Sequence, residues 1–121
     1  MRATYHDTLR VDLIETNTWL LARPLRVTFE PGLNGLEASN IMVPRGFVTD
    51  FASVPRIPLA YLAMGGIGER AAVVHDYLCT ERFTTSSVAA DVFGACLKAD
   101  KVPWWKRVLM VRAVKWFGPR F

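Results

Sequence analysis

Residues 69–81 read ERAAVVHDYLCTE, a run of mostly small and apolar residues without glycine or proline. Such a run predicts a helix. Hydroxyl side chains at positions 84–87 can cap a second helix that extends to about Ala99. Pro103 suits the first turn of a third helix, which continues through Phe117 and ends at Gly118-Pro119. The second half of the chain is therefore predicted to be helical.

The first half has the composition of strands and turns. Four stretches are rich in β-branched and aromatic residues, namely Leu9–Ile14, Thr18–Ala22, Leu25–Phe29 and Ala38–Val43. Asn34-Gly35 suits a tight turn, and three prolines make residues 44–60 an irregular loop. We predict an α+β fold, with antiparallel strands in 1–43, a motif loop in 44–60, and three helices in 65–118. The first two helices should form an antiparallel pair because their connection is short.

The bulk composition favours a single domain over residues 1–121. With 121 residues, 51% of them hydrophobic, the chain can bury one core but not two. No apolar run is long enough to span a bilayer, and the first residues lack the apolar centre of a secretory signal. We expect synthesis and folding in a cytosol, where Cys79 and Cys96 would remain free thiols.

The positive charge is concentrated near the C-terminus. From residue 98 onward seven basic residues face one acidic residue, a surplus of six, so with a net charge of +4 residues 1–97 carry −2. Residues 103–117 also contain more apolar side chains than one face of a small domain buries. The last helix could therefore bind a protein or an anionic lipid surface, or pack part of this excess on the other helices. We do not expect a nucleic acid partner.

Two neighbouring polar residues, His75 and Asp76, interrupt the apolar character of the first predicted helix, and Asp91 does the same in the second. We predict a hydrogen bond between His75 and Asp91 across the helix pair, since buried polar groups need partners. A carboxylate there would raise the pKa of His75 and leave its other nitrogen free to act as a general base. The alternative is that His75 is a core histidine with satisfied hydrogen bonds and Asp76 an exposed residue of the same helix.

Asp76 points to a different face of its helix from His75 and could ligate a hard cation such as Ca²⁺. The loop 49–53 could supply further oxygens, Asp50 foremost. Asp50 could instead cap a turn or pair with Arg45 or Arg56. Cys79 lies one helical turn from His75, which would suit a Cys–His nucleophile, but the same spacing arises from core packing. We expect Cys79 to be a core residue.

Three segments together resemble a known family. GFVTDFASVPR (46–56), AVVHDYL (72–78) and ADVF (90–93) are similar to a domain-of-unknown-function family common in tailed phages and prophages, with the pattern GFxTDxASVPR followed by HDYLY. The resemblance implies a phage-encoded protein made in the host cytoplasm, with incorporation in the virion or tail as one outcome.

The pairing of AxxxHD with a following AD segment also resembles, more distantly, the two helices of secreted phospholipases A2. This resemblance implies that His75 activates water, Asp91 orients the histidine, and Asp76 binds Ca²⁺ with the loop of Asp50. The chain departs from that pattern. The cysteines that link the two phospholipase helices correspond to Ala72 and Ala90, the tyrosine four residues after the histidine is Cys79, and the glycine-rich calcium loop has only a loose counterpart in residues 50–53.

Two functions of different kinds follow from these patterns. The first is a phage-encoded, metal-dependent ester hydrolase. The second is a non-catalytic tail or virion component that binds other virion proteins through its last helix, and a small host-takeover factor is a third alternative.

Overall fold

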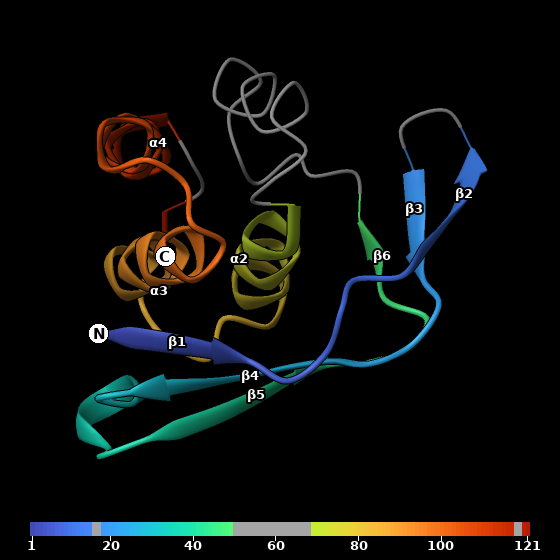
Figure 1. The fold of residues 1–121 in the computed structure, drawn as a ribbon, viewed down its shortest axis with the longest axis horizontal. Helices are drawn as coiled ribbons and strands as arrows, with labels where there is room; N and C mark the ends of the chain where they lie inside the picture. The colour runs from blue at the N-terminus through green and yellow to red at the C-terminus, as the bar shows by residue number, and fades with distance from the viewer. Residues whose placement is uncertain (16–17, 50–68, 118–119) are drawn as a thin grey trace.

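The structure, a computed structural model, describes residues 1–15, 18–49, 69–117 and 120–121 (Figure 1). Strands come first and helices last, so the predicted α+β arrangement is confirmed. The strands are β1 (Arg2–Tyr5), β2 (Val11–Glu15), β3 (Thr18–Leu21), β4 (Leu25–Glu30), β5 (Ser39–Val43) and β6 (Val48–Thr49). The helices are α2 (Glu69–Glu81), α3 (Ser86–Ala99) and α4 (Trp104–Phe117), and a short 3-10 turn spans Leu33–Gly35.

The strands form two antiparallel sheets. One has the order β1-β4-β5 and the other the order β2-β3-β6. In the first sheet Val27 of β4 lies opposite Tyr5 of β1 and Ile41 of β5. The sequence patterns located β2 to β5 to within a few residues but missed β1 and β6, which are short strands. They did not predict which strands pair, because each sheet joins strands that are separated in the chain.

The core lies between the first sheet and the helices. Side chains of β4 alternate between buried and more exposed positions, with Leu25, Val27 and Phe29 buried, as expected of a strand with one covered face. Helices α2 and α3 lie over this sheet, and α4 lies on the side of α3 away from it (Figure 1). Residues 71–75 of α2 are all buried, so this part of the helix has no exposed face. Helix α3 buries one broad face, and α4 covers only part of α3.

Local signals account for the helix boundaries. The predicted helix over 69–81 is confirmed, and the other two begin and end close to their predicted residues. Thr85 is the N-cap of α3, and its hydroxyl accepts a hydrogen bond from the backbone N–H of Val88 at 3.3 Å. Asn34 and Gly35 both have positive φ, which fits the turn expected there.

Two further observations concern the cysteines and the lengths of the helices. Both Cys79 and Cys96 are free, and Cys96 is buried. Across the described ranges, every helix falls short of the length and apolar character required to cross a bilayer.

Candidate functional site

His75 is held in the interior by α2. Its side chain is 1% exposed and packs against the ring of Phe93 on α3, with 5.2 Å between ring centroids. Cys79, one turn later on α2, places its Sγ 3.7 Å from both ring nitrogens. Burial lowers the pKa of His75 to about 4, because the cationic form is poorly solvated there. His75 is therefore a neutral residue of the core at physiological pH.

The predicted hydrogen bond between His75 and Asp91 is absent from the described structure. Asp91 is about half exposed, and its Oδ1 lies 3.2 Å from Nζ of Lys115 on α4. The helical repeat explains this difference. Phe93 follows Asp91 by about 200° around α3, so a side chain at 91 faces away from the ring that Phe93 touches. The expected rise in the pKa of His75 was also wrong, since burial lowers it.

Asp76 lies where the two sequence motifs meet. Its carboxylate accepts a hydrogen bond from the hydroxyl of Thr49, a buried residue of β6. This contact agrees with the expectation that Asp76 faces the motif loop. Asp50 itself lies outside the described residues, so the prediction that Asp50 and Asp76 share a cation remains a prediction. In the described part of the chain, His, Cys, Asp and Glu side chains nowhere gather in threes, so those residues alone do not form a calcium site.

Three aromatic rings lie beside this meeting point. Tyr77 contacts Phe47 at 5.3 Å and Phe83 at 5.7 Å between ring centroids, both in edge-on geometry. Phe47 belongs to the GFVTD motif and Tyr77 to the HDYL motif. The aromatic positions of the two motifs therefore have a packing role, because they join the segment before β6 to α2.

A partly buried ion pair links β1, α2 and the end of α3, and sequence reasoning missed it. Nη2 of Arg70 lies 2.6 Å from Oδ1 of Asp100, and the Arg70 guanidinium lies 3.9 Å from the centroid of the Tyr5 ring. Burial raises the pKa of Asp100 and outweighs the opposing effect of Arg70. Because these groups already satisfy one another, we assign the cluster a structural role. Its sequence signal, an arginine in an apolar helix, does not identify the partner.

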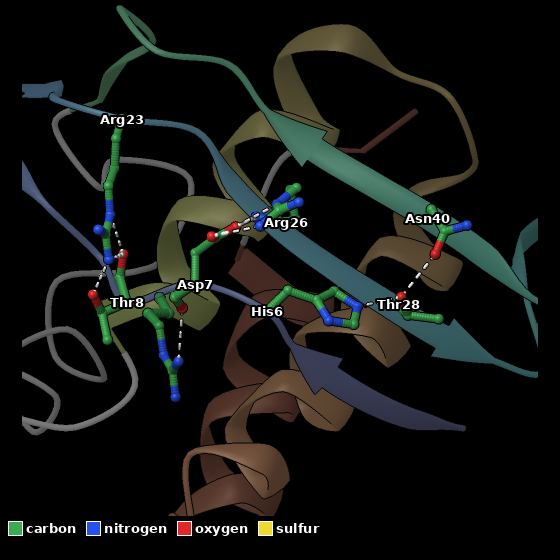
Figure 2. Close-up of polar contacts among 8 residues, drawn as sticks. His6, Asp7, Thr8, Arg23, Arg26, Thr28 and Asn40 are labelled. Atoms are coloured by element: carbon green, nitrogen blue, oxygen red, sulfur yellow. Dashed lines mark hydrogen bonds and ion pairs between the residues drawn. The ribbon is translucent and has the colours of Figure 1, made fainter.

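The other histidine, His6, belongs to a polar network on the exposed side of the first sheet (Figure 2). Arg70 connects this network to its own cluster, since its guanidinium donates a hydrogen bond to the backbone carbonyl of Asp7 at 3.1 Å. His6 Nε2 lies 2.7 Å from Oγ1 of Thr28. Its neighbour Asp7 accepts hydrogen bonds from the Arg26 guanidinium. These bonds are the main reason why the pKa of Asp7 falls to about 2. Within this network Asp7 and Arg26 form an ion pair at 2.9 Å, which engages the carboxylate of Asp7.

Helix α4 exposes most of its apolar side chains. Met110 and Val114 are buried and hold the helix against the rest of the protein. Its outer face consists of side chains that are 40–71% exposed, namely Trp104, Trp105, Val108, Leu109 and Trp116. The predicted apolar excess is confirmed. The alternative that part of the excess packs on the other helices, through Trp104, Val108, Val111 and the stem of Lys115, is borne out for Val111, which packs against the core. It is wrong for Trp104, which is 69% exposed.

An open groove of about 620 Å³ runs between α3 and α4, next to this outer face. Its apolar part is formed by Gly94, Ala95, Val108 and Val111. Its charged part contains the cations of Lys98, Arg107, Arg112 and Lys115, together with Asp91. Lys115 neutralises Asp91, so the groove presents a positive surface beside apolar walls.

Comparison with known proteins identifies the family without assigning an activity. The family described as "Protein of unknown function (DUF1353)" matches residues 25–114. The Uncharacterized protein y4jT of Sinorhizobium fredii (strain NBRC 101917 / NGR234) is 35% identical over 81 residues, which are 64% of this chain and 24% of that protein. The chain thus spans about a quarter of that relative, and no solved structure matches it. Since the family match covers most of the chain, the protein belongs to the DUF1353 family.

Proposed function

We propose that this protein is a non-catalytic binding component, encoded by a tailed phage or prophage, that works through the outer face of α4. The observation that carries the proposal is the exposure of that face, where Trp104 and Trp116 are 69% and 71% exposed. The resemblance of the GFVTDFASVPR and HDYL motifs to a phage and prophage family supports the phage setting. Exposed apolar patches of this kind mark interaction sites in soluble proteins.

Trp104 and Trp116 on α4, which are 69% and 71% exposed, contribute little to the fold. Met110 and Val114 already anchor the helix, and they are 2% and 4% exposed. A side chain that remains mostly in water gains little free energy from folding, because the hydrophobic gain follows the apolar area removed from water. The tryptophans are therefore available to a partner, which would bury them.

The surroundings of His75 argue against hydrolysis at α2. A general base requires a proton-accepting nitrogen that reaches water and a pKa near the working pH. His75 is 1% exposed, its ring contacts Phe93 and Cys79, and its pKa is lowered by burial. Asp91, the predicted orienting carboxylate, pairs with Lys115 instead.

Replacement of Trp105 and Trp116 by Ser, singly and together, tests the binding role. Because Trp116 is 71% exposed and Trp105 is 46% exposed, we expect the urea midpoint to change little in Trp116→Ser and more in Trp105→Ser. Association should fall in both, as measured by light scattering and by co-sedimentation with liposomes. Leu36→Ser, at a residue 59% exposed elsewhere on the surface, is the matched control. A large loss of stability without any change in association would show that α4 is core and would refute the proposal.

A metal-dependent ester hydrolase is the second candidate, and one observation favours it. The hydrogen bond from Thr49 to Asp76 joins the two motifs on which the phospholipase resemblance rests. Calorimetry with Ca²⁺, comparing the wild type with Asp76→Asn, tests this candidate together with an assay of phospholipid ester hydrolysis. Calcium binding and turnover that both disappear in Asp76→Asn would replace the non-catalytic proposal. Failure of the wild type to bind millimolar calcium would exclude a calcium-dependent hydrolase.

A further inference from the structure

We infer that the partner of α4 is the surface of an anionic lipid bilayer, which receives the tryptophans of the outer face at the depth of the headgroups while the cations of the α3–α4 groove bind lipid phosphates. The inference rests on the proposed function and names the partner of the same surface.

Charge complementarity is the first argument. Residues 101–121 contain six basic residues and no acidic one. Arg112 is exposed between the tryptophans and also lines the groove, and Lys98 extends the cations onto α3. Anionic leaflets attract basic segments of this kind within about a Debye length of the surface.

The kind of apolar residue is the second argument. Three of the exposed side chains are tryptophans, whose rings combine a large apolar surface with one N–H donor. Tryptophan is enriched at bilayer–water interfaces for this reason. Lys106 lies 5.4 Å from the Trp105 ring centroid, so a cation accompanies an aromatic ring at the edge of this face. Apolar bulk with basic edges is the pattern of helices that lie in the plane of a membrane surface.

The shape of the surface is the third argument. Positions 105, 109, 112 and 116 follow one another at spacings of four, three and four residues, so Trp105, Leu109, Arg112 and Trp116 form a single ridge along the helix. A fluid bilayer conforms to a convex ridge, whereas a protein partner needs a complementary groove of its own. Beside the ridge lies the groove, which offers a lipid both kinds of contact. Its apolar walls are formed by Val108 and Val111, and one of its cations is Arg107.

The test uses the 121-residue chain and vesicles of phosphatidylcholine, either pure or with about 30% phosphatidylserine. We expect co-sedimentation and a blue shift of tryptophan fluorescence with the anionic vesicles only, and weaker binding at high salt. The variant Lys98→Gln/Arg112→Gln should bind roughly tenfold or more weakly, because each cation near an anionic surface contributes about fivefold.

Arg10→Gln/Arg45→Gln is the matched charge control, because both residues are exposed and lie before the helices; it should retain most of the binding. Far-UV circular dichroism verifies that each variant is folded. Equal binding to neutral and anionic vesicles, an equal loss in both charge variants, or no binding by the folded wild type would overturn the inference. If vesicles fail to bind but Trp105→Ser/Trp116→Ser changes the oligomer mass, the binding role stands with a protein as its partner. If those substitutions affect only stability, both proposals fail.

Discussion

Acidification is expected to destabilise this protein through His75. The side chain is 1% exposed and its pKa in the folded state is about 4, compared with an ordinary value of 6.5. The unfolded chain therefore takes up the proton at a higher pH than the folded protein does. Above pH 6.5 the titration of His75 leaves the free energy of unfolding unchanged. As the pH decreases from 6.5 toward 4, this free energy should fall. Below about pH 4 His75 should cause no further loss.

The magnitude follows from the gap between the two pKa values. One pKa unit corresponds to about 1.4 kcal/mol, so complete protonation of the unfolded state would cost the folded protein about 3 kcal/mol. Most of this cost, about 2 to 3 kcal/mol, should already be present near pH 4.5. For a small domain with a total stability of about 5–15 kcal/mol, this effect is easily measured.

Urea denaturation of the wild type and of His75→Gln, at about pH 7.5 and about pH 4.5, measures this contribution. The variant cannot titrate at position 75, so the difference between the two proteins isolates His75 from Asp7, Asp100 and other acids. We expect His75→Gln to be the less stable protein at neutral pH and the difference to shrink by about 2 to 3 kcal/mol on acidification. His6→Gln, at an exposed histidine, is the matched control. A difference between the wild type and His75→Gln that stays constant between the two pH values would refute the assignment of His75 as a buried neutral residue.

Three further substitutions test the interactions that hold the helices. Thr85→Ala should cost about 1 kcal/mol of unfolding free energy because it removes the N-cap bond to Val88, whereas Thr85→Ser should restore most of it; equal losses in both would contradict the cap. Arg70→Met should cost about 3 kcal/mol of unfolding free energy because the carboxylate of Asp100 loses its guanidinium partner. Adding Asp100→Asn should recover part of that loss. A double variant no more stable than Arg70→Met would argue against an uncompensated charge at Asp100. Asp91→Ala should change the urea-derived stability by less than about 1 kcal/mol because its ion pair is exposed, and a larger loss would indicate a role that the structure does not contain.

The sequence by itself determined the α+β class, the positions of the three helices and the apolar excess of the last one. These features depend on local signals. The Thr85 hydroxyl caps α3 by accepting a hydrogen bond from the backbone N–H of Val88, only three residues later. A run without glycine or proline, such as 69–81, is helical in most surroundings. The excess on α4 required only a comparison between its apolar content and the single face that a small core can bury.

Only the tertiary structure decided which polar residues meet. Asp91 lies between buried neighbours in the sequence, which suggested that it too was buried, yet the helical repeat turns it toward Lys115 and away from His75. Tyr5 and Asp100 lie 3.5 Å apart at their oxygens although 95 positions separate them in the chain. Such contacts depend on how β1, α2 and α3 pack together, and a single sequence does not contain that long-range information in any local pattern. The pKa of His75 is lowered and not raised as predicted, for the same reason. The pKa of a buried group depends on the neighbours that packing brings around it.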